Sequence, residues 1–170
     1  LFTSLLTDDC IARGKALLDG GVRYLGGTNE TYGNINTSDS LWVIRDLVFN
    51  QKKYTLRQLN DAMLANFNGY EALRKDCLNC DKYGNDLETA DTMANDLYEF
   101  VAKGVRDRGI AIGMQYFLIV ISNNQLNTEW GNRTAASPDG RLSCMYMNPA
   151  NNPQGGANKS GPTAMLNSLA

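Results

Sequence analysis

The chain has 170 residues, with 16 Lys and Arg against 18 Asp and Glu and a net charge of −2. Without a basic patch of interleaved aromatic residues, this balance argues against a nucleic-acid partner. No apolar run reaches the ~18 residues of a membrane-spanning helix, so no membrane partner is expected. His is absent. Its absence excludes a Ser-His-Asp triad, a Cys-His pair and any metal site with a His ligand.

The first 36 residues predict a helix, a strand and a loop. Thr7 and the two acids after it favour a helix start, since Thr caps the first turn and acids suit the positive end of the helix dipole. The helix is expected to stop at Gly20-Gly21. Its predicted buried face consists of Cys10, Ile11, Ala16, Leu17 and Leu18. We then expect a short strand over 22–25 and an ordered loop over 26–36.

Apolar residues at helical spacing predict two more helices. The first runs from 41 to about 50 and is capped by Ser38 or Asp39. The second begins after Thr55, a good capping residue. Its predicted buried face consists of Leu56, Leu59, Met63, Leu64 and Phe67. A further turn or helix leads from Tyr70 and Leu73 towards Cys77.

The second half of the chain predicts a turn over 81–86, a long helix over about 87–106 and a strand over 116–122. The helix is expected to bury Met93, Leu97, Val101 and Phe100. The strand is a continuous β-branched and aromatic run, which is typical of a strand buried on both faces of a parallel sheet. The alternation of helices and strands predicts an α/β fold. Two or three strands are few for a complete sheet, which indicates part of a larger one.

Cysteines and possible glycosylation sites leave two alternatives open. Four cysteines permit two disulfides in a secreted protein, and four Asn-X-Ser/Thr sites fit the same alternative. These residues are Cys10, Cys77, Cys80, Cys144, Asn29, Asn36, Asn132 and Asn158. An Asn-rich chain produces such sites by chance, so we favour reduced thiols in a cytoplasm.

Two patterns that could hold a metal ion or a redox centre are interpreted as structural. Cys77-Leu-Asn-Cys80 follows a helix instead of opening one, which argues against a redox pair, and nothing completes a metal site around it. An acidic row shares one face of the long helix, as exposed helix faces commonly do. Its members are Glu88, Asp91, Asn95 and Glu99. No metal site is predicted.

Ser137-Pro-Asp-Gly140 predicts a tight turn. Pro138 fixes φ at the first corner, Asp139 is able to bond its own backbone, and Gly140 accepts a positive φ. Arg141 then projects from this turn. Taken alone, the pattern favours a surface turn with a solvated Arg. Together with its neighbours, it favours a loop anchor in which Asp139 and Arg141 form hydrogen bonds without taking part in chemistry.

The late motifs together resemble the glycyl radical enzyme family, the pyruvate formate-lyase-like proteins. The segment 134–141, Thr-Ala-Ala-Ser-Pro-Asp-Gly-Arg, is similar to that family's Gly-Ala-Thr/Ser-Pro-Asp-Gly-Arg. The segment 158–168, Asn-Lys-Ser-Gly-Pro-Thr-Ala-Met-Leu-Asn-Ser, resembles its Asp-Lys-Asn-Gly-Pro-Thr-Ala-Val-Leu-Lys-Ser. Segments 66–74, 82–86 and 20–24 also match in order. After Arg141 the chain departs from the better-known members, which implies a different substrate pocket.

The resemblance implies a helix-rich half-barrel fragment of a ten-stranded α/β barrel. In the family, one barrel loop carries a Cys that becomes a thiyl radical, in a Gly-Cys-X-Glu setting. A second loop carries the Gly that stores the radical, in an Arg-Val-X-Gly-Tyr setting. None of the four cysteines here has Glu two residues on, and the pair Gly69-Tyr70 lies in a different setting. We therefore expect residues 1–170 to be one segment of the catalytic domain, between the two loops.

The implied function is that of a fragment, inactive alone, of a radical lyase, dehydratase or formate acyltransferase. It would supply barrel wall and part of a small-molecule pocket, and no catalytic residue. Asn123 and Asn124, at the end of the last strand, and Asn151 and Asn152, in the divergent loop, are the predicted substrate-binding residues. The alternative is a non-catalytic structural or interaction domain derived from the same fold.

The resemblance also implies the partners of the parent protein. No cofactor is expected on this chain, but the parent would carry a glycyl radical installed by an S-adenosylmethionine-dependent activating enzyme. The fragment would pack against the remainder of the barrel, and the parent is expected to be a homodimer. Because oxygen destroys a glycyl radical, the resemblance implies an anaerobic cytoplasm.

Overall fold

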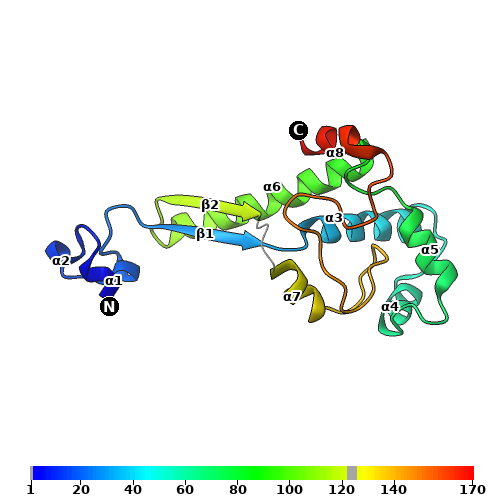
Figure 1. Cartoon of the computed structure of the whole chain (residues 1–170), viewed down its shortest axis with the longest axis horizontal. Helices are drawn as coiled ribbons and strands as arrows, with labels where there is room; N and C mark the ends of the chain where they lie inside the picture. The colour runs from blue at the N-terminus through cyan, green and yellow to red at the C-terminus, as the bar shows by residue number, and fades with distance from the viewer. Residues whose placement is uncertain (1, 122–125) are drawn as a thin grey trace. The chain divides into compact units, whose positions relative to one another are not determined.

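The computed structural model describes residues 2–121 and 126–170 (Figure 1). The chain divides into two compact units. Unit 1 consists of Leu1–Glu30 and Phe100–Val120, and unit 2 consists of Thr31–Glu99 and Ile121–Ala170. The long helix α6 (Glu88–Ala111) begins in unit 2 and ends in unit 1. It continues five residues beyond the predicted end, and Phe100 on its expected buried face is exposed.

Three short helical segments open unit 1 where one helix was predicted. They are α1 (Phe2–Leu5), α2 (Cys10–Arg13) and the 3-10 helix η1 (Leu17–Asp19). The single helix is wrong because Asp9 and Gly14 adopt left-handed conformations, with φ 72° and 62°, and so bound α2 on both sides. Cys10 is buried as expected, whereas Ile11 and Leu18 are exposed.

Strand β1 (Gly26–Thr31) pairs with β2 (Tyr116–Ile121), and Figure 1 shows both arrows running in the same direction. The predicted strand is confirmed over 116–121, whereas β1 occupies a segment expected to be a loop and 22–25 forms no strand. Glycines suggested the loop, but in the structure they permit close packing. A Cβ on Gly27 would lie 3.0 Å from Met114 Cε. A Cβ on Gly109 of α6 would collide with Phe117 of β2, 1.9 Å away.

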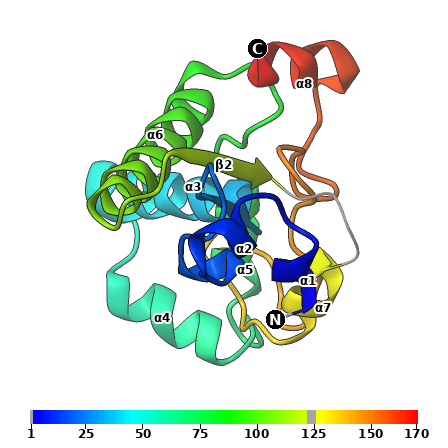
Figure 2. The ribbon, with the colours of Figure 1, turned by 90° about the vertical axis from the view of Figure 1, so that its left-hand side faces the viewer.

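Unit 2 is built mostly of helices. They are α3 (Asn34–Val43), the π-helix η2 (Ile44–Asn50), α4 (Leu56–Leu64), α5 (Glu71–Asn79), the first part of α6, α7 (Leu126–Asn132) and α8 (Gly161–Leu169). In Figures 1 and 2 the long segment between α7 and α8, coloured yellow to orange, passes alongside α3. None of the helices in the described ranges is both long and apolar enough to span a bilayer.

Helix α3 begins seven residues before the predicted start at 41. Ser38 and Asp39, expected as caps, lie inside it and are each only 1% exposed, so that prediction is wrong. The N-cap is Gly33, with φ 71° and no side chain to accept a bond from the first turn. Asn148 supplies that acceptor instead, at 3.1 Å from the backbone N of Asn36. A distant residue therefore determines where this helix begins.

Helix α4 confirms its predicted cap. Thr55 Oγ1 accepts a bond from the backbone N of Gln58 at 3.2 Å, and Gln58 Oε1 accepts one from the backbone N of Thr55 at 2.9 Å. This reciprocal pair is a capping box. The core beside α4 contains Val43, Leu47, Leu59, Ala62, Phe67, Leu73 and Cys77. Leu56 and Leu64 were expected in this core but are exposed.

Candidate functional site

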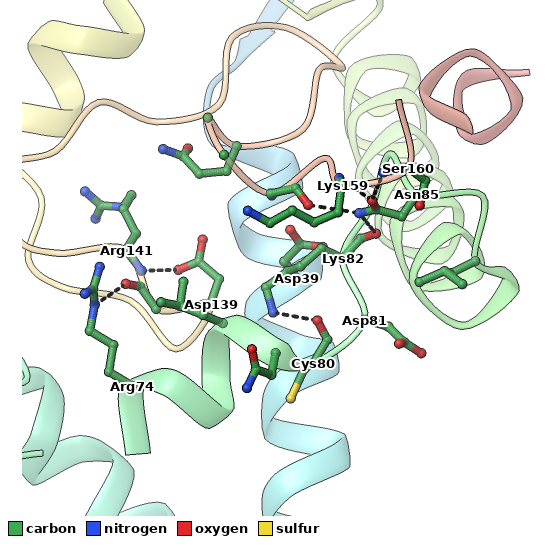
Figure 3. A pocket seen from close by; sticks show the side chains of 18 of the residues that line it. Asp39, Arg74, Cys80, Asp81, Lys82, Asn85, Asp139, Arg141, Lys159 and Ser160 are labelled. Atoms are coloured by element: carbon green, nitrogen blue, oxygen red, sulfur yellow. Dashed lines mark hydrogen bonds between the residues drawn. The ribbon is translucent and has the colours of Figure 1, made fainter. Parts of the chain in front are cut away.

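A cavity of about 600 Å³ lies within unit 2 (Figure 3). Its walls come from the end of α5, the turn before α6, the turn at 139–141 and the loop over 154–160. Its lining mixes charged groups of both signs with amide and apolar side chains. Among these residues are Asp39, Arg74, Asp81, Lys82, Asn85, Asp139, Arg141, Met145, Gln154 and Lys159.

The predicted tight turn forms one wall of this cavity. The backbone N of Gly140 donates to Ser137 O at 3.0 Å, and Gly140 has φ 94°, so the turn expectation is confirmed. Asp139 Oδ1 accepts from Ser137 Oγ at 2.6 Å and from the backbone N of Arg141 at 3.2 Å. Arg74 of α5 donates from Nε to Gly140 O at 3.0 Å. The turn is held from within and from a neighbouring helix.

Arg141 is 4% exposed, so the solvated side chain that the turn alone suggested is wrong. Its guanidinium donates hydrogen bonds to several backbone carbonyls of the surrounding loop. Nη1 donates to Met145 O at 2.8 Å and Leu142 O at 3.2 Å, and Nη2 donates to Ala135 O. Burial lowers the pKa of Arg141 from its ordinary value, and the carboxylate of Asp139 opposes this effect.

Asn36 of α3 joins the turn to the loop that follows it. Its Nδ2 donates to Asp139 Oδ2 at 2.6 Å and to Gln154 Oε1 at 3.1 Å. Its Oδ1 accepts from the backbone N of Asn148 at 2.7 Å. Asn36 is one of the possible glycosylation sites, but its side chain is buried and its amide nitrogen is already bonded. The structure therefore argues against a glycan at this position.

Asp39 and Lys82 are buried charged groups beside the cavity. Asp39 Oδ1 accepts from the backbone N of Tyr83 at 3.0 Å, while Oδ2 has no partner among the described residues. Burial raises the pKa of Asp39 to about 7. Lys82 donates from Nζ to Cys77 O at 2.6 Å and to Cys80 O at 3.3 Å. The site thus contains a carboxyl group that is able to change its charge near neutral pH.

Asn85 ties the turn before α6 to the C-terminal segment. Its Nδ2 donates to Lys82 O and to Ala157 O, both at 3.0 Å. Its Oδ1 accepts from the backbone N of Lys159 at 2.7 Å and of Ser160 at 3.1 Å (Figure 3). A single amide therefore fixes the approach of the loop over 157–160.

A second contact docks helix α8 beside the start of α6. Ser168 Oγ donates to Asp91 Oδ2 at 3.1 Å and accepts from the backbone N of Asp86. Asp91 belongs to the acidic row of α6. Among the described residues no group of three or more Cys, Asp and Glu side chains is arranged to hold a metal ion.

Burial has the largest effect on the thiol pKa values of Cys77 and Cys80. It raises the pKa of Cys77 to about 12 and that of Cys80 to about 11, so both remain thiols at neutral pH. A redox-active pair needs a lowered thiol pKa. All four cysteines are free in the structure, and Cys144 is the exposed one.

Two of the four predicted substrate-binding residues belong to the described part of the chain. Asn151 and Asn152 are half-buried in the loop and are not among the lining residues. Asn123 and Asn124 lie outside the described residues. Asn148, a third Asn of the same loop, is only 1% exposed, and its side chain is bonded to Asn36 N and Ala150 O.

Sequence reasoning missed Asn36, Asp39, Lys82 and Asn85 as site residues. Lys82 and Asn85 stand in a segment that resembled the family, which was a usable signal. Asn36 and Asp39 gave no such signal, because their partners are distant in sequence. Asp139 is 103 positions from Asn36, and Tyr83 is 44 positions from Asp39. Four of the five resembling segments meet here. Ser143, beside the turn, bonds Asn66; Gly140 bonds Arg74; and Asn85 bonds Lys159.

Comparisons with known proteins identify relatives of this chain. The pyruvate formate lyase-like family model matches residues 1–126. Trans-4-hydroxy-L-proline dehydratase of Clostridioides difficile is 33% identical over 98% of this chain and 21% of the relative. (2S)-3-sulfopropanediol dehydratase of Klebsiella oxytoca is 33% identical over 99% of this chain and 21% of the relative.

Solved structures match over almost the whole chain. Glycerol-bound B12-independent glycerol dehydratase from Clostridium butyricum superposes with a TM-score of 0.84 at 31% identity, over 99% of this chain and 21% of that one. A glycyl radical enzyme from Archaeoglobus fulgidus superposes with a TM-score of 0.81 at 30% identity, over 98% of this chain and 21% of that one. The chain spans about a fifth of the length of these relatives. It belongs to the pyruvate formate-lyase-like family of glycyl radical enzymes.

Proposed function

We propose that the chain forms part of the catalytic domain of a glycyl radical dehydratase or lyase. The cavity of unit 2 carries this proposal, because four segments typical of the family converge on its walls. Asp139 and Arg141 anchor these walls by hydrogen bonds and take no part in the reaction. Residues 1–170 supply barrel wall and one side of a small-molecule pocket within a ten-stranded barrel.

The radical chemistry belongs to the rest of the parent protein. None of the four cysteines has Glu two residues on, and no Arg-Val-X-Gly-Tyr segment occurs here. The chain is therefore inactive alone. The parent carries a thiyl-forming Cys and a glycyl radical, installed by an S-adenosylmethionine-dependent enzyme in an anaerobic cytoplasm. Asn123, Asn124, Asn151 and Asn152 remain proposed substrate contacts, in the part of the pocket that the rest of the barrel completes.

A hydroxylated small molecule is the proposed substrate. Several relatives are named for such compounds, including hydroxyproline, sulfopropanediol and glycerol. The cavity lining supports this class, since its amide and charged side chains are hydrogen-bonding groups suited to hydroxyl and carboxylate substituents. Loss of water or another leaving group from such a substrate is the proposed reaction.

An electron paramagnetic resonance experiment tests the proposal. The complete parent is activated without oxygen by its activating enzyme and offered glycerol, 1,2-propanediol, trans-4-hydroxy-L-proline or isethionate. We expect a glycyl radical signal and turnover of one compound, while the 170-residue chain treated in the same way gives neither. A parent without Gly-Cys-X-Glu upstream and Arg-Val-X-Gly-Tyr downstream, or without the radical signal, would overturn the proposal.

A further inference from the structure

The segment over 142–157, here called the cavity loop, has little regular structure to hold it. It contains no helix or strand and follows the turn at 137–140. Backbone bonds from Met147 N to Asn127 O and from Asn152 N to Pro149 O give it local support. Met145 and residues 154–157 of this loop line the cavity. Whatever positions the loop therefore shapes that wall.

Asn148 is the most deeply buried point of the cavity loop, at 1% exposure. Its backbone N and its side-chain Oδ1 both bond to Asn36, at 2.7 and 3.1 Å. Asn36 and Asn148 thus satisfy each other's polar groups in a reciprocal pair, 112 residues apart in sequence. Because an unpaired buried polar group is costly, this pair specifies a single position for the middle of the loop.

The remaining polar atoms of Asn36 fix both ends of the same wall. Its Nδ2 bonds Asp139 of the turn and Gln154 of the loop, at 2.6 and 3.1 Å. Its backbone O accepts from Ser40 Oγ, which in turn accepts from the backbone N of Asp139. Only an amide supplies one acceptor and two donors in this arrangement. Asp in its ionised form would place a carboxylate against that of Asp139. Ala would remove the side-chain partner of Asp139 Oδ2, Gln154 Oε1 and the backbone N of Asn148.

We infer that Asn36 is a positioning residue that determines the conformation of the cavity loop and, through it, which substrate the parent enzyme accepts. The positioning step rests on the hydrogen bonds above. The specificity step rests on the proposed function. Asn36 does not line the cavity, so it acts through Asn148, Asp139 and Gln154 and not by touching substrate.

Hydrogen exchange on the complete parent protein tests the positioning step without any need for activity. In Asn36→Asp, the backbone amides of the cavity loop around Asn148 should exchange about tenfold faster or more, because the donor to Gln154 of the loop is lost and a second carboxylate faces Asp139. Adding Asp139→Asn should restore slow exchange, because the pair regains one donor and one acceptor. Asn34→Ala is the matched control. Asn34 lies on the same helix, but its amide bonds Thr31 and not the loop.

A second substitution covers the case in which Asn36→Asp does not fold. Asn148→Ala removes the acceptor on the loop side and should accelerate exchange of the same amides. Unchanged exchange in both variants, or a double variant Asn36→Asp with Asp139→Asn that exchanges as fast as the single one, overturns the inference.

Kinetics of the activated parent test the specificity step. We expect Asn36→Asp to raise KM by about tenfold with a much smaller change in kcat, since a displaced pocket wall weakens substrate binding. Asn34→Ala should leave both constants unchanged. A variant with a normal radical signal, faster loop exchange and unchanged KM would overturn the specificity step alone. If the wild-type parent forms no radical, the proposed function fails, and exchange still decides the positioning step.

Discussion

Arg141 shows how one buried side chain organises a loop. Its guanidinium donates to the carbonyls of residues 135, 142 and 145, and its Nε donates to Ser137 Oγ at 3.2 Å. These carbonyls point inward and have no regular secondary structure to satisfy them. A planar fork with five N–H donors reaches several carbonyls at once, which an ammonium group does not.

Arg141→Lys should therefore be strongly destabilising although the charge is kept. Lys would leave one or more buried carbonyls unpaired, and we expect the free energy of unfolding to fall by about 2–4 kcal/mol. Urea unfolding of the chain measures this loss. Arg133→Lys is the control, because Arg133 is exposed and pairs with Glu129 at 2.8 Å, and a change within ~0.5 kcal/mol is expected. Equal losses in the two variants would contradict the role of Arg141.

The buried carboxyl of Asp39 makes stability depend on pH. Burial raises its pKa from the ordinary 3.8 to about 7, so the folded chain holds this proton more tightly than the unfolded chain. The contribution of this group to stability is complete below the unfolded value, decreases as pH rises from about 4 to about 7, and is lost above that.

Asp39→Asn should remove this component of the pH dependence. The amide stays neutral and resembles the protonated carboxyl. The free energy of unfolding of the variant should therefore rise relative to that of the wild-type chain as pH increases from about 4 to about 7. Above pH 7, the difference in free energy of unfolding between the variant and the wild-type chain should stay constant. Urea unfolding of both proteins across this range measures it. Stability curves that run parallel from pH 4 to 8 would contradict the raised pKa of Asp39.

At the scale of single elements, local sequence predicted those whose causes are local. The capping box of α4 involves residues three apart, and the turn at 137–140 depends on its own Pro, Asp and Gly. β2 was evident from a continuous β-branched run. The start of α3 was missed because its acceptor, Asn148, comes from the other end of the chain. β1 was missed because glycines in a strand are favoured by tertiary packing and not by local propensity.

The cap of α4 gives a prediction at this scale. Thr55→Ala removes the acceptor for the backbone N of Gln58 and should lower the free energy of unfolding by about 1 kcal/mol. Thr55→Ser keeps the hydroxyl and should have a much smaller effect. Thermal or urea unfolding of the two variants side by side checks this. A loss in Thr55→Ser as large as in Thr55→Ala would show that the methyl group, and not the cap, is responsible.

For the whole molecule, the sequence allowed the family to be recognised but left the detailed site unresolved. The α/β character, the helix-rich composition and the family resemblance followed from motifs and periodicity. The cavity did not, since its walls come from segments between 39 and 160 that no local pattern brings together. Buried polar residues such as Asn36 and Asp39 are especially hard to predict. In sequence they are typical of caps and exposed sites, and only tertiary partners make their burial favourable.

The reciprocal pair of Asn36 and Asn148 has a consequence for co-translational folding. At ~5–20 residues per second, about 6–22 s separate the synthesis of two residues 112 positions apart. During that interval the first turn of α3 has no acceptor from Asn148, and the polar atoms of Asn36 remain hydrated. Unit 2 is therefore unable to close around Asn36 until the segment that contains Asn148 has been synthesised.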